Sequence, residues 1–530
     1  MIRRLTPALL LAAASLSAQS PVPLYTDLGT YHKAIGTKVP KAQQYFDQGL
    51  RLVYGFNHAE AIRSFTRATE LDPTCAMCWW GIAYAYGPHV NAGMDSASGV
   101  RAYQAAQKAQ ALSSDTPSWE RAYIEAVGAR YAAVPPANRA SLDSAYSRAM
   151  RATAKKYPKD LDATALAAES MMDLRPWNYW TPEGKPYPGS DELVRMLESV
   201  IARNPEHPGA CHYYIHAVEA VNPQAAVPCA ERLARLMPGE GHMVHMPAHI
   251  YVRVGRYKDA AASNVHAIHT DEMFIEGQPQ PTVYSLAYYP HNIHFLAFVS
   301  SMAGRSAQAM DAARTLKSKV NMDVAKNVGM LQEMVPYYAL TLTTFGRWNE
   351  VLAEPLPPAD MRFPTALARY ARGVAYAAKG DFASARVELD SVKAIDAATP
   401  ADAEHKAPIS IAVHALMGEI ATRSGKADEG IAHFKEALAI EDKGLYFEPP
   451  KWYYPIRQSL GAALLKAGRN AEAETVYRED LKRFPENGWS LYGLAAALRA
   501  QGKSAEAAAV EKRFAKAWTD ADVKLTASRF

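Results

Sequence analysis

The feature that most constrains the fold is a spacing of small and aromatic residues that recurs along the chain. Near the N-terminus it consists of Gly49, Ala61, Phe65, Ala68 and Pro73. Small residues let two helices cross closely, an aromatic side chain fills the space between them, and a proline ends the second helix. The spacing therefore predicts a helical hairpin with Phe65 between its two helices.

The same spacing returns in the C-terminal part of the chain. The copies contain Gly461, Ala473, Tyr477 and Pro485; Gly418, Phe434 and Ala437, with Gly430 where alanine is usual; Gly373, Tyr376 and Ala385; and a degenerate pair around Ala495 and Ala507. The pattern resembles the tetratricopeptide repeat (TPR), which has a period of about 34 residues. Such hairpins bury their apolar faces by stacking on one another. We therefore predict an all-α TPR solenoid with inserted loops rich in proline and aromatic residues.

Changes in the strength of the repeat predict how the chain is divided. We expect a signal peptide at residues 1–18, an N-terminal TPR at 40–96 and a helical TPR-like segment with an aromatic loop at 97–200. Histidine-rich TPR units follow at 201–320, further TPR-like helices at 321–400, and C-terminal repeats with a cap at 401–530. The aromatic loop runs from Pro176 to Pro188, and its proline and glycine content excludes a helix. It fits either a loop packed over the solenoid or a lid on a binding groove.

The first 20 residues have the composition of a secretory signal peptide. Arg3 and Arg4 give the positively charged start, Leu9–Ala14 the apolar core, and Ser17 and Ala18 small residues for cleavage. This apolar run is shorter than the roughly 18 residues that a membrane-spanning helix needs, and no later segment is apolar enough to span. We expect a periplasmic or secreted protein without a membrane span.

Charge and cysteine content narrow the partners further. The net charge is +4 and no basic run stands out, so nothing indicates a nucleic-acid partner. In an oxidising compartment cysteines are expected to pair. Cys75 and Cys78 fit a local disulfide, a redox pair or a soft metal site. Cys211 and Cys229 are close enough in sequence to face each other across two antiparallel helices.

Histidines are concentrated in one part of the chain. The segment from His207 to His294 holds ten of the 16, where even scattering would place fewer than three. Several are three or four residues apart, a spacing that puts side chains on one face of a helix. Neutral imidazole is the commonest protein ligand for transition metals. The sequence therefore predicts a transition-metal site in this segment.

The TPR register places these histidines at equivalent positions of three successive units. In the TPR family those positions line the concave groove where ligands bind, and packed helices lie about 8–10 Å apart. The resemblance thus implies that seven imidazoles point into one groove: His212, His216, His242, His245, His249, His291 and His294. Pro247 leaves two alternatives. It either kinks the helix through this segment or begins it late. In the second case His242 and His245 lie in the preceding turn, and the argument from a shared helix face fails for them.

The sequence also resembles a group of exported bacterial TPR proteins with a histidine-rich central region. The shared stretches are FNHxEA from Phe56, CAMCWW from Cys75, HPGA and HYYIH from His207, HMVHMPAHIY from His242 and YYPHN from Tyr288. This resemblance implies the fold and export, and it implies no particular activity.

Buried imidazoles need partners, because an unpaired polar ring away from water costs free energy. A network with Tyr213, Tyr214, Glu219, Asp271 and Glu272 would supply them, and so would a metal. All-histidine ligands favour copper or zinc over iron, magnesium or calcium. We predict a groove with a transition metal, serving either a metalloenzyme of unknown substrate or metal handling. The alternative is a scaffold that binds a protein or peptide in the groove without metal or turnover. Motifs of zinc proteases, serine hydrolases, phosphate loops and dinucleotide sites are absent.

Overall fold

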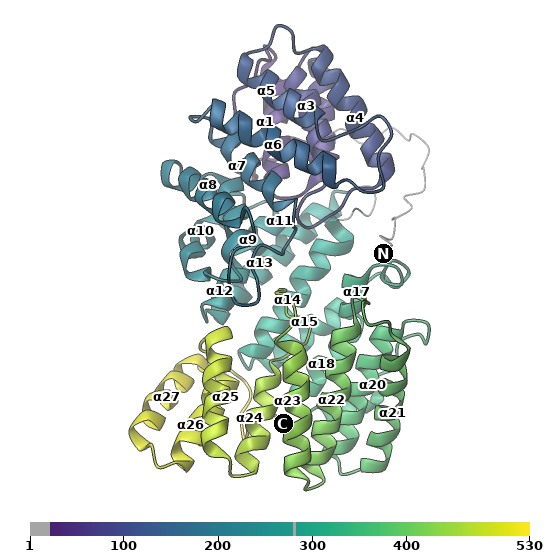
Figure 1. Cartoon of the computed structure of the whole chain (residues 1–530), viewed down its shortest axis with the longest axis vertical. Coiled ribbons are helices and arrows are strands. Elements are labelled where there is room, and N and C mark those ends of the chain that lie inside the picture. The colour runs from purple at the N-terminus through teal and green to yellow at the C-terminus, as the bar shows by residue number, and fades with distance from the viewer. Residues whose placement is uncertain (1–21, 279–281, 283) are drawn as a thin grey trace. The chain divides into compact units, whose positions relative to one another are not determined.

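The computed structural model describes residues 22–278, 282 and 284–530, so the predicted signal peptide lies outside the described residues. Figure 1 shows helices stacked against their neighbours in the chain. Over the described residues there is no strand, and the extended pairing amounts to two isolated bridges, His89 with Ala92 and Trp180 with Pro186. The all-α prediction is confirmed.

The chain divides into two compact units. Unit 1 comprises the described residues up to Ile250 and those from His266 to Ser285, and unit 2 comprises Tyr251–Val265 and Leu286–Phe530. The six segments predicted from the sequence follow changes in the strength of the repeat and not the limits of the compact units. Their boundaries stay predictions.

Unit 1 is built from helical hairpins that follow one another in the chain. Its helices are α1 (Pro40–Tyr54), α2 (His58–Leu71), α3 (Ala76–Ala85), α4 (Ser96–Ala111), α5 (Ser118–Gly128), α6 (Ala140–Lys156), α7 (Leu161–Met172), α8 (Ser190–Arg203), α9 (Pro208–Val218), α10 (Pro223–Leu236) and α11 (Gly241–His245). Three elements have residues in both units: α12 (Pro247–Arg253), α13 (Tyr257–Glu276) and the π-helical turn η1 (Tyr284–Tyr288).

Unit 2 continues the same construction. Its helices are α14 (Tyr289–Met302), α15 (Ser306–Lys319), α16 (Met322–Ala325), α17 (Gly329–Met334), α18 (Tyr337–Thr344), α19 (Trp348–Ala353), α20 (Arg362–Ala378), α21 (Phe382–Ala398), α22 (Lys406–Arg423), α23 (Ala427–Glu441), α24 (Ile456–Lys466), α25 (Asn470–Arg483), α26 (Gly488–Ala500) and α27 (Ser504–Ala517). None of the helices in the described part of the chain is long and apolar enough to cross a membrane.

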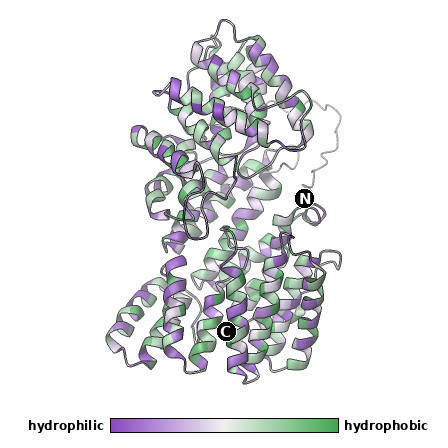
Figure 2. Ribbon diagram, in the orientation of Figure 1, coloured by the Kyte–Doolittle hydropathy of each residue, from purple (hydrophilic) through white to green (hydrophobic). Residues whose placement is uncertain are grey.

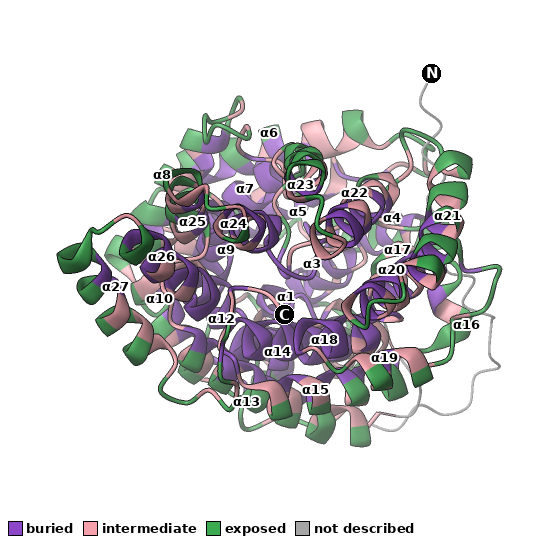
Figure 3. Cartoon of the chain, turned by 90° about the horizontal axis from the view of Figure 1, so that it is seen from below, coloured by how far each residue is buried: buried purple, intermediate pink, exposed green. Residues whose placement is uncertain are grey.

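The helices are amphipathic, as a stacked array requires. Figure 2 shows hydrophilic and hydrophobic residues side by side along most of them. Figure 3 shows that α14 is buried along nearly its whole length, whereas α27 is largely exposed and buries only Ala507 and Val510 on its inner face. A helix with one narrow buried stripe suits the end of an array, because its outer face has no further hairpin to cover it.

The repeat spacing acts through close contact between an aromatic ring and two glycines. In unit 1 the Phe65 ring lies against Gly49 of α1 and Gly81 of α3, where an added Cβ would come closer than 3.0 Å to the ring. In unit 2 the Tyr477 ring lies in the same way between Gly461 of α24 and Gly493 of α26. The predicted position of Phe65 between two helices is confirmed, and the same ring also packs against the helix that follows.

A buried carboxyl in unit 2 gives a pH-dependent stability. Asp480 is fully buried and accepts hydrogen bonds from the Ser490 hydroxyl (2.6 Å) and the Asn487 amide (3.2 Å). Burial raises its pKa to about 6. The folded chain therefore holds this proton more tightly than the unfolded chain does, so the stabilisation is complete below about pH 4 and is lost as pH rises through about 6.

We expect Asp480→Asn to remove this loss of stability at rising pH. Relative to the wild type, the variant should gain about 2 kcal/mol in free energy of unfolding as pH rises from about 4 to about 7, measured by urea unfolding. Asp428→Asn is the control, because Asp428 is exposed. A wild-type profile with the same pH slope as Asp480→Asn would contradict the assignment.

Candidate metal centre

Helix α9 brings the first two candidate ligands together. His207 caps its N-terminus, with Nδ1 accepting a hydrogen bond from the Ala210 amide (3.1 Å), and Pro208 occupies the first helical position, where no amide hydrogen is needed. His212 and His216 then lie one turn apart on the same face. Both are buried, with exposed fractions of 0% and 3%.

The hydrogen bonds of these two rings fix which nitrogen carries the proton. His212 donates from Nδ1 to the backbone carbonyl of Tyr54 (2.6 Å), because a carbonyl can only accept. His216 donates from Nδ1 to Oε1 of Glu219 (3.3 Å). Each neutral ring therefore has a lone pair on Nε2, and the two Nε2 atoms are 3.1 Å apart.

Two facing lone pairs repel each other unless a proton or a metal ion lies between them. A proton on either ring is disfavoured, because burial lowers the pKa of His212 well below its usual value and also lowers that of His216. A metal ion fits the spacing. With metal–nitrogen bonds of about 2.0–2.1 Å and tetrahedral angles, two nitrogen ligands lie roughly 3.3 Å apart. The pair is thus set up to hold a transition metal through Nε2.

The next three histidines come from two short helices instead of one. The helix breaks at Met246, so His242 and His245 lie in α11 while His249 lies in α12, which begins at Pro247. This is the late start that the sequence left open, with the two earlier histidines in the preceding turn. The rings still adjoin: Nε2 of His245 is 2.8 Å from Nε2 of His249, and the ring centroids of His242 and His245 are 6.1 Å apart.

A third ligand reaches the first pair from α11. One nitrogen of His242 and one each of His212 and His216 all lie within 4.8 Å of one another, and the three side chains are buried. Burial also lowers the pKa of His242 well below its usual value, which keeps that imidazole neutral and able to bind a metal. We call His212, His216 and His242 the histidine triad.

Glu219 joins the triad to the other two histidines of unit 1. Its Oε1 accepts from His216 and its Oε2 accepts from Nδ1 of His249 (2.7 Å). Burial would raise the pKa of this carboxyl, but the interactions with His249 and His216 lower it to about 2, so it is ionised. A carboxylate on the outer nitrogen of a histidine fixes the ring and strengthens the inner nitrogen as a metal ligand. The negative charge also favours a cation nearby.

Aromatic side chains enclose the histidines. The Phe56 ring lies 4.5 Å from that of His212, and the Trp177 ring meets that of His216 edge-on at 4.9 Å. Both aromatic residues have a positive φ, 59° and 63°, although neither is glycine. Such a backbone costs about 1–3 kcal/mol and persists where the surroundings hold it in place. The backbone is thus strained at the two rings that cover the candidate ligands.

The aromatic loop lies against α9. The Trp180 indole donates to the carbonyl of Ala217 (2.7 Å), and the Ser190 hydroxyl donates to the carbonyl of Tyr179 (2.6 Å). The segment is free of helix from Pro176 to Pro188, as predicted. The loop is packed over α9, which agrees with the first of the two predicted roles, and the role of a lid stays a prediction.

The structure brings together five of the seven predicted ligands: His212, His216, His242, His245 and His249, all in unit 1. His291 and His294 belong to α14 in unit 2. There His294 is buried against the Tyr337 ring at 4.1 Å, and burial lowers its pKa to about 4. Their participation in a common site stays a prediction. His266 and His269, also in the histidine-rich segment, are exposed on α13.

Of the residues expected from the sequence to form hydrogen bonds with the histidines, Glu219 does so. Tyr214 instead donates to Glu198 (3.0 Å), and Asp271 accepts from Tyr284 (2.7 Å). Three further contributors were missed. The Tyr54 carbonyl has no sequence signal, because any residue supplies a carbonyl. Phe56 lies in the FNHxEA stretch and Trp177 in the aromatic loop, and these are the signals that could have found them.

The four cysteines follow the sequence expectations in part. Cys75 and Cys78 form a disulfide at the start of α3. Cys211 in α9 and Cys229 in α10 are free, buried and in contact, and their hydrogen bond, together with burial, raises the pKa of the Cys211 thiol. Of the three alternatives for the first pair, the structure has the disulfide, and the predicted facing of the second pair is confirmed.

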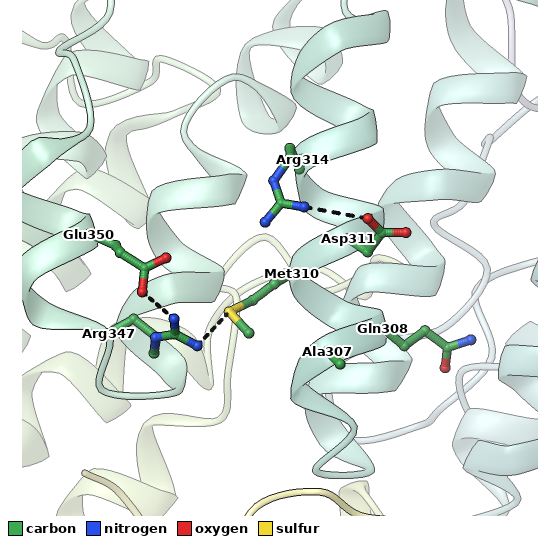
Figure 4. A pocket seen from close by; sticks show the side chains of 7 residues that line it. All are labelled: Ala307, Gln308, Met310, Asp311, Arg314, Arg347 and Glu350. Atoms are coloured by element: carbon green, nitrogen blue, oxygen red, sulfur yellow. Dashed lines mark hydrogen bonds and ion pairs between the residues drawn. The ribbon is translucent and has the colours of Figure 1, made fainter.

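A separate depression lies on unit 2. Figure 4 shows the side chains that line it, which come from α15 and the start of α19. Its volume is about 610 Å³. Its charged side chains are paired with one another, Arg314 with Asp311 (3.5 Å) and Arg347 with Glu350 (2.5 Å). The side chains that line it are Ala307, Gln308, Met310, Asp311, Arg314, Arg347 and Glu350.

Comparison with known proteins supports the repeat assignment. Residues 459–522 and 366–391 match models of the tetratricopeptide repeat. No curated protein matches the chain. Similar solved structures include the human IFIT1 dimer with m7Gppp-AAAA (11% identity, 91% of each chain, TM-score 0.33). Two others are the Cut9–Hcn1 hetero-tetramer of the APC/C (13%, 91% and 88%, 0.29) and the P58(IPK) TPR domain (11%, 87% and 99%, 0.21). The two repeat matches, together with the stacked helices of the structure, confirm the predicted TPR-type α-solenoid.

Proposed function

We propose that this chain is a TPR solenoid that binds a transition metal at the histidine triad of unit 1. The single observation that carries the proposal is the pair of Nε2 lone pairs of His212 and His216, 3.1 Å apart and held by partners on their Nδ1 atoms. His242 supplies the third ligand. Three imidazoles leave a fourth tetrahedral position for water or substrate, which is the arrangement of catalytic rather than structural zinc sites.

The ligand set favours copper or zinc. Imidazole nitrogen binds both ions well, whereas magnesium and calcium prefer oxygen ligands. A bound ion would polarise a substrate or lower the pKa of a bound water beside the rings of Phe56 and Trp177. Glu219 would hold the imidazoles in place and balance part of the ion's charge. A metalloenzyme of this kind and a metal-handling protein share the site and differ in turnover.

The proposal is tested on the purified full chain, stripped with a chelator and reloaded with Zn²⁺ or Cu²⁺. We expect stoichiometric metal by elemental analysis after desalting, and the loss of one equivalent of metal per chain in His212→Ala/His242→Ala. His269→Ala is the matched control, because this histidine lies in the same unit but is exposed. Far-UV circular dichroism checks that each variant is folded. Wild-type protein that retains no stoichiometric metal would disprove the proposal.

A second candidate function is an interaction scaffold. Both matched TPR segments and the charged depression of Figure 4 lie in unit 2. A protein or peptide partner of unit 2 would therefore be affected by Arg314→Glu/Arg347→Glu and unaffected by His212→Ala/His242→Ala. Quantitative pull-down with each variant separates the two functions. Equal recovery of a partner with all variants would exclude the depression as its binding site.

We also propose that the chain is exported to the periplasm or secreted. The composition of the first 20 residues supports export, and the disulfide of Cys75 and Cys78 suits an oxidising compartment. N-terminal sequencing of the protein recovered from the periplasm or the medium tests this, with a new N-terminus expected near Ala18.

A further inference from the structure

We propose that His245 and His249 form a second metal position beside the histidine triad, so that the site holds two ions. The inference rests on the proposed function, since it adds a neighbour to the triad's ion. The pair repeats the geometry of His212 and His216: two histidines four residues apart, with Nε2 facing Nε2 at 2.8 Å against 3.1 Å in the triad. Both members are buried, with exposed fractions of 0% and 2%.

The tautomer of His249 is fixed in the same way as that of His216. Its Nδ1 donates to Oε2 of Glu219 (2.7 Å), and the carboxylate can only accept. Nε2 of His249 is therefore the ring nitrogen on the side away from Glu219, and it faces Nε2 of His245. As in the triad, the outer nitrogen is held by a hydrogen-bond acceptor, and the inner nitrogen faces the partner imidazole at the place where a metal would bind.

Glu219 is the feature that argues for two ions rather than one. Each of its two oxygens holds one histidine, His216 on one side and His249 on the other. One carboxylate thus orients a ligand of each group. A site for a single ion would need only one of these contacts, whereas an anionic carboxylate between two groups of neutral imidazoles reduces the repulsion between two cations.

The two groups are also close enough to act together. The ring centroids of His216 and His249 are 6.0 Å apart, and those of His242 and His245 are 6.1 Å apart. In two-metal centres the ions lie about 3.5–4 Å from each other and clamp one substrate from both sides. With all-imidazole ligands of this kind, the chemical class of substrate that fits is a small molecule or group that bridges two copper or zinc ions.

The test uses Cu²⁺ alone as the probe on the full chain. Bound copper is counted by elemental analysis after desalting, and electron paramagnetic resonance (EPR) reports whether the ions are neighbours, because two adjacent Cu²⁺ ions couple and lose signal. We expect two coppers per chain and a weak EPR signal per copper in the wild type and in His269→Ala. His212→Ala and His249→Ala should each bind one copper with the full signal of an isolated Cu²⁺ ion.

The outcomes separate this inference from the proposed function. One copper per wild-type chain, lost in His212→Ala and kept in His249→Ala, overturns the second position and leaves the triad. No stoichiometric copper overturns both. Two coppers with full, uncoupled signals show separated sites and also overturn the paired centre. Should a variant fail to fold, the wild type alone decides: its EPR signal should rise up to one equivalent of copper and fall with the second.

Discussion

Replacing Glu219 with alanine is expected to weaken metal binding by about 10- to 100-fold, the usual effect of removing a carboxylate that supports a metal-bound histidine. Without the Glu219 carboxylate, the Nδ1–H groups of His216 and His249 lose the oxygen that accepts their hydrogen bonds. Each ring can then rotate or change tautomer, and the nitrogen lone pair no longer faces the ion. Competition with a metal-binding dye, at constant pH, measures the change in affinity.

Two further variants make this result specific. Glu219→Gln should lie between alanine and the wild type, because the amide oxygen can accept one hydrogen bond while the amide nitrogen cannot accept the other. Glu198→Ala is the control, since this exposed glutamate accepts a hydrogen bond from Tyr214. Equal affinity in Glu219→Ala and the wild type would show that Glu219 does not position the ligands.

A second large effect is expected from Arg130→Ala, which should lower the free energy of unfolding by about 3–5 kcal/mol. The Arg130 side chain is fully buried in unit 1. Its Nη2 donates to Asp173 (2.6 Å) and to the carbonyl of Pro88 (2.7 Å), and its guanidinium lies 4.4 Å from the centre of the Tyr146 ring. Alanine leaves a buried carboxyl without its cation and a cavity where the side chain packed.

The loss of unfolding free energy caused by Arg130→Ala should increase as pH rises. Burial raises the pKa of Asp173, and the nearby charge of Glu169 raises it further. A carboxyl with a raised pKa stabilises the fold at low pH, and that stabilisation is lost as pH rises through the folded-state pKa. Removing Arg130 raises the pKa further, so the variant should be closest to the wild type in acid. Urea unfolding at several pH values measures this.

Arg151→Ala is the control for Arg130. Arg151 forms an exposed ion pair with Glu192 (2.7 Å), and such pairs contribute about 0–1 kcal/mol. Equal destabilisation by the two substitutions would contradict the assignment of Arg130 to the core.

The sequence determined the fold because the contacts behind it recur within one or two hairpins. Phe65 against Gly49 and Tyr477 against Gly461 are short-range pairs with a fixed spacing, and a repeated spacing is visible in a single sequence. The i, i+4 spacing of His212 and His216 is equally local, so the sequence also placed these two on one helix face.

The tertiary structure decided how the histidines meet. The acceptor for His212 is a carbonyl 158 residues away in the chain, and Glu219 reaches His249 from 30 residues away. Phe56 and Trp177 lie against the histidines with a positive φ, a backbone conformation that is not expected for an aromatic residue from the sequence. Helical spacing sets which side chains share a face, but the proton on each ring and the direction of each lone pair depend on partners that only folding brings within hydrogen-bonding distance.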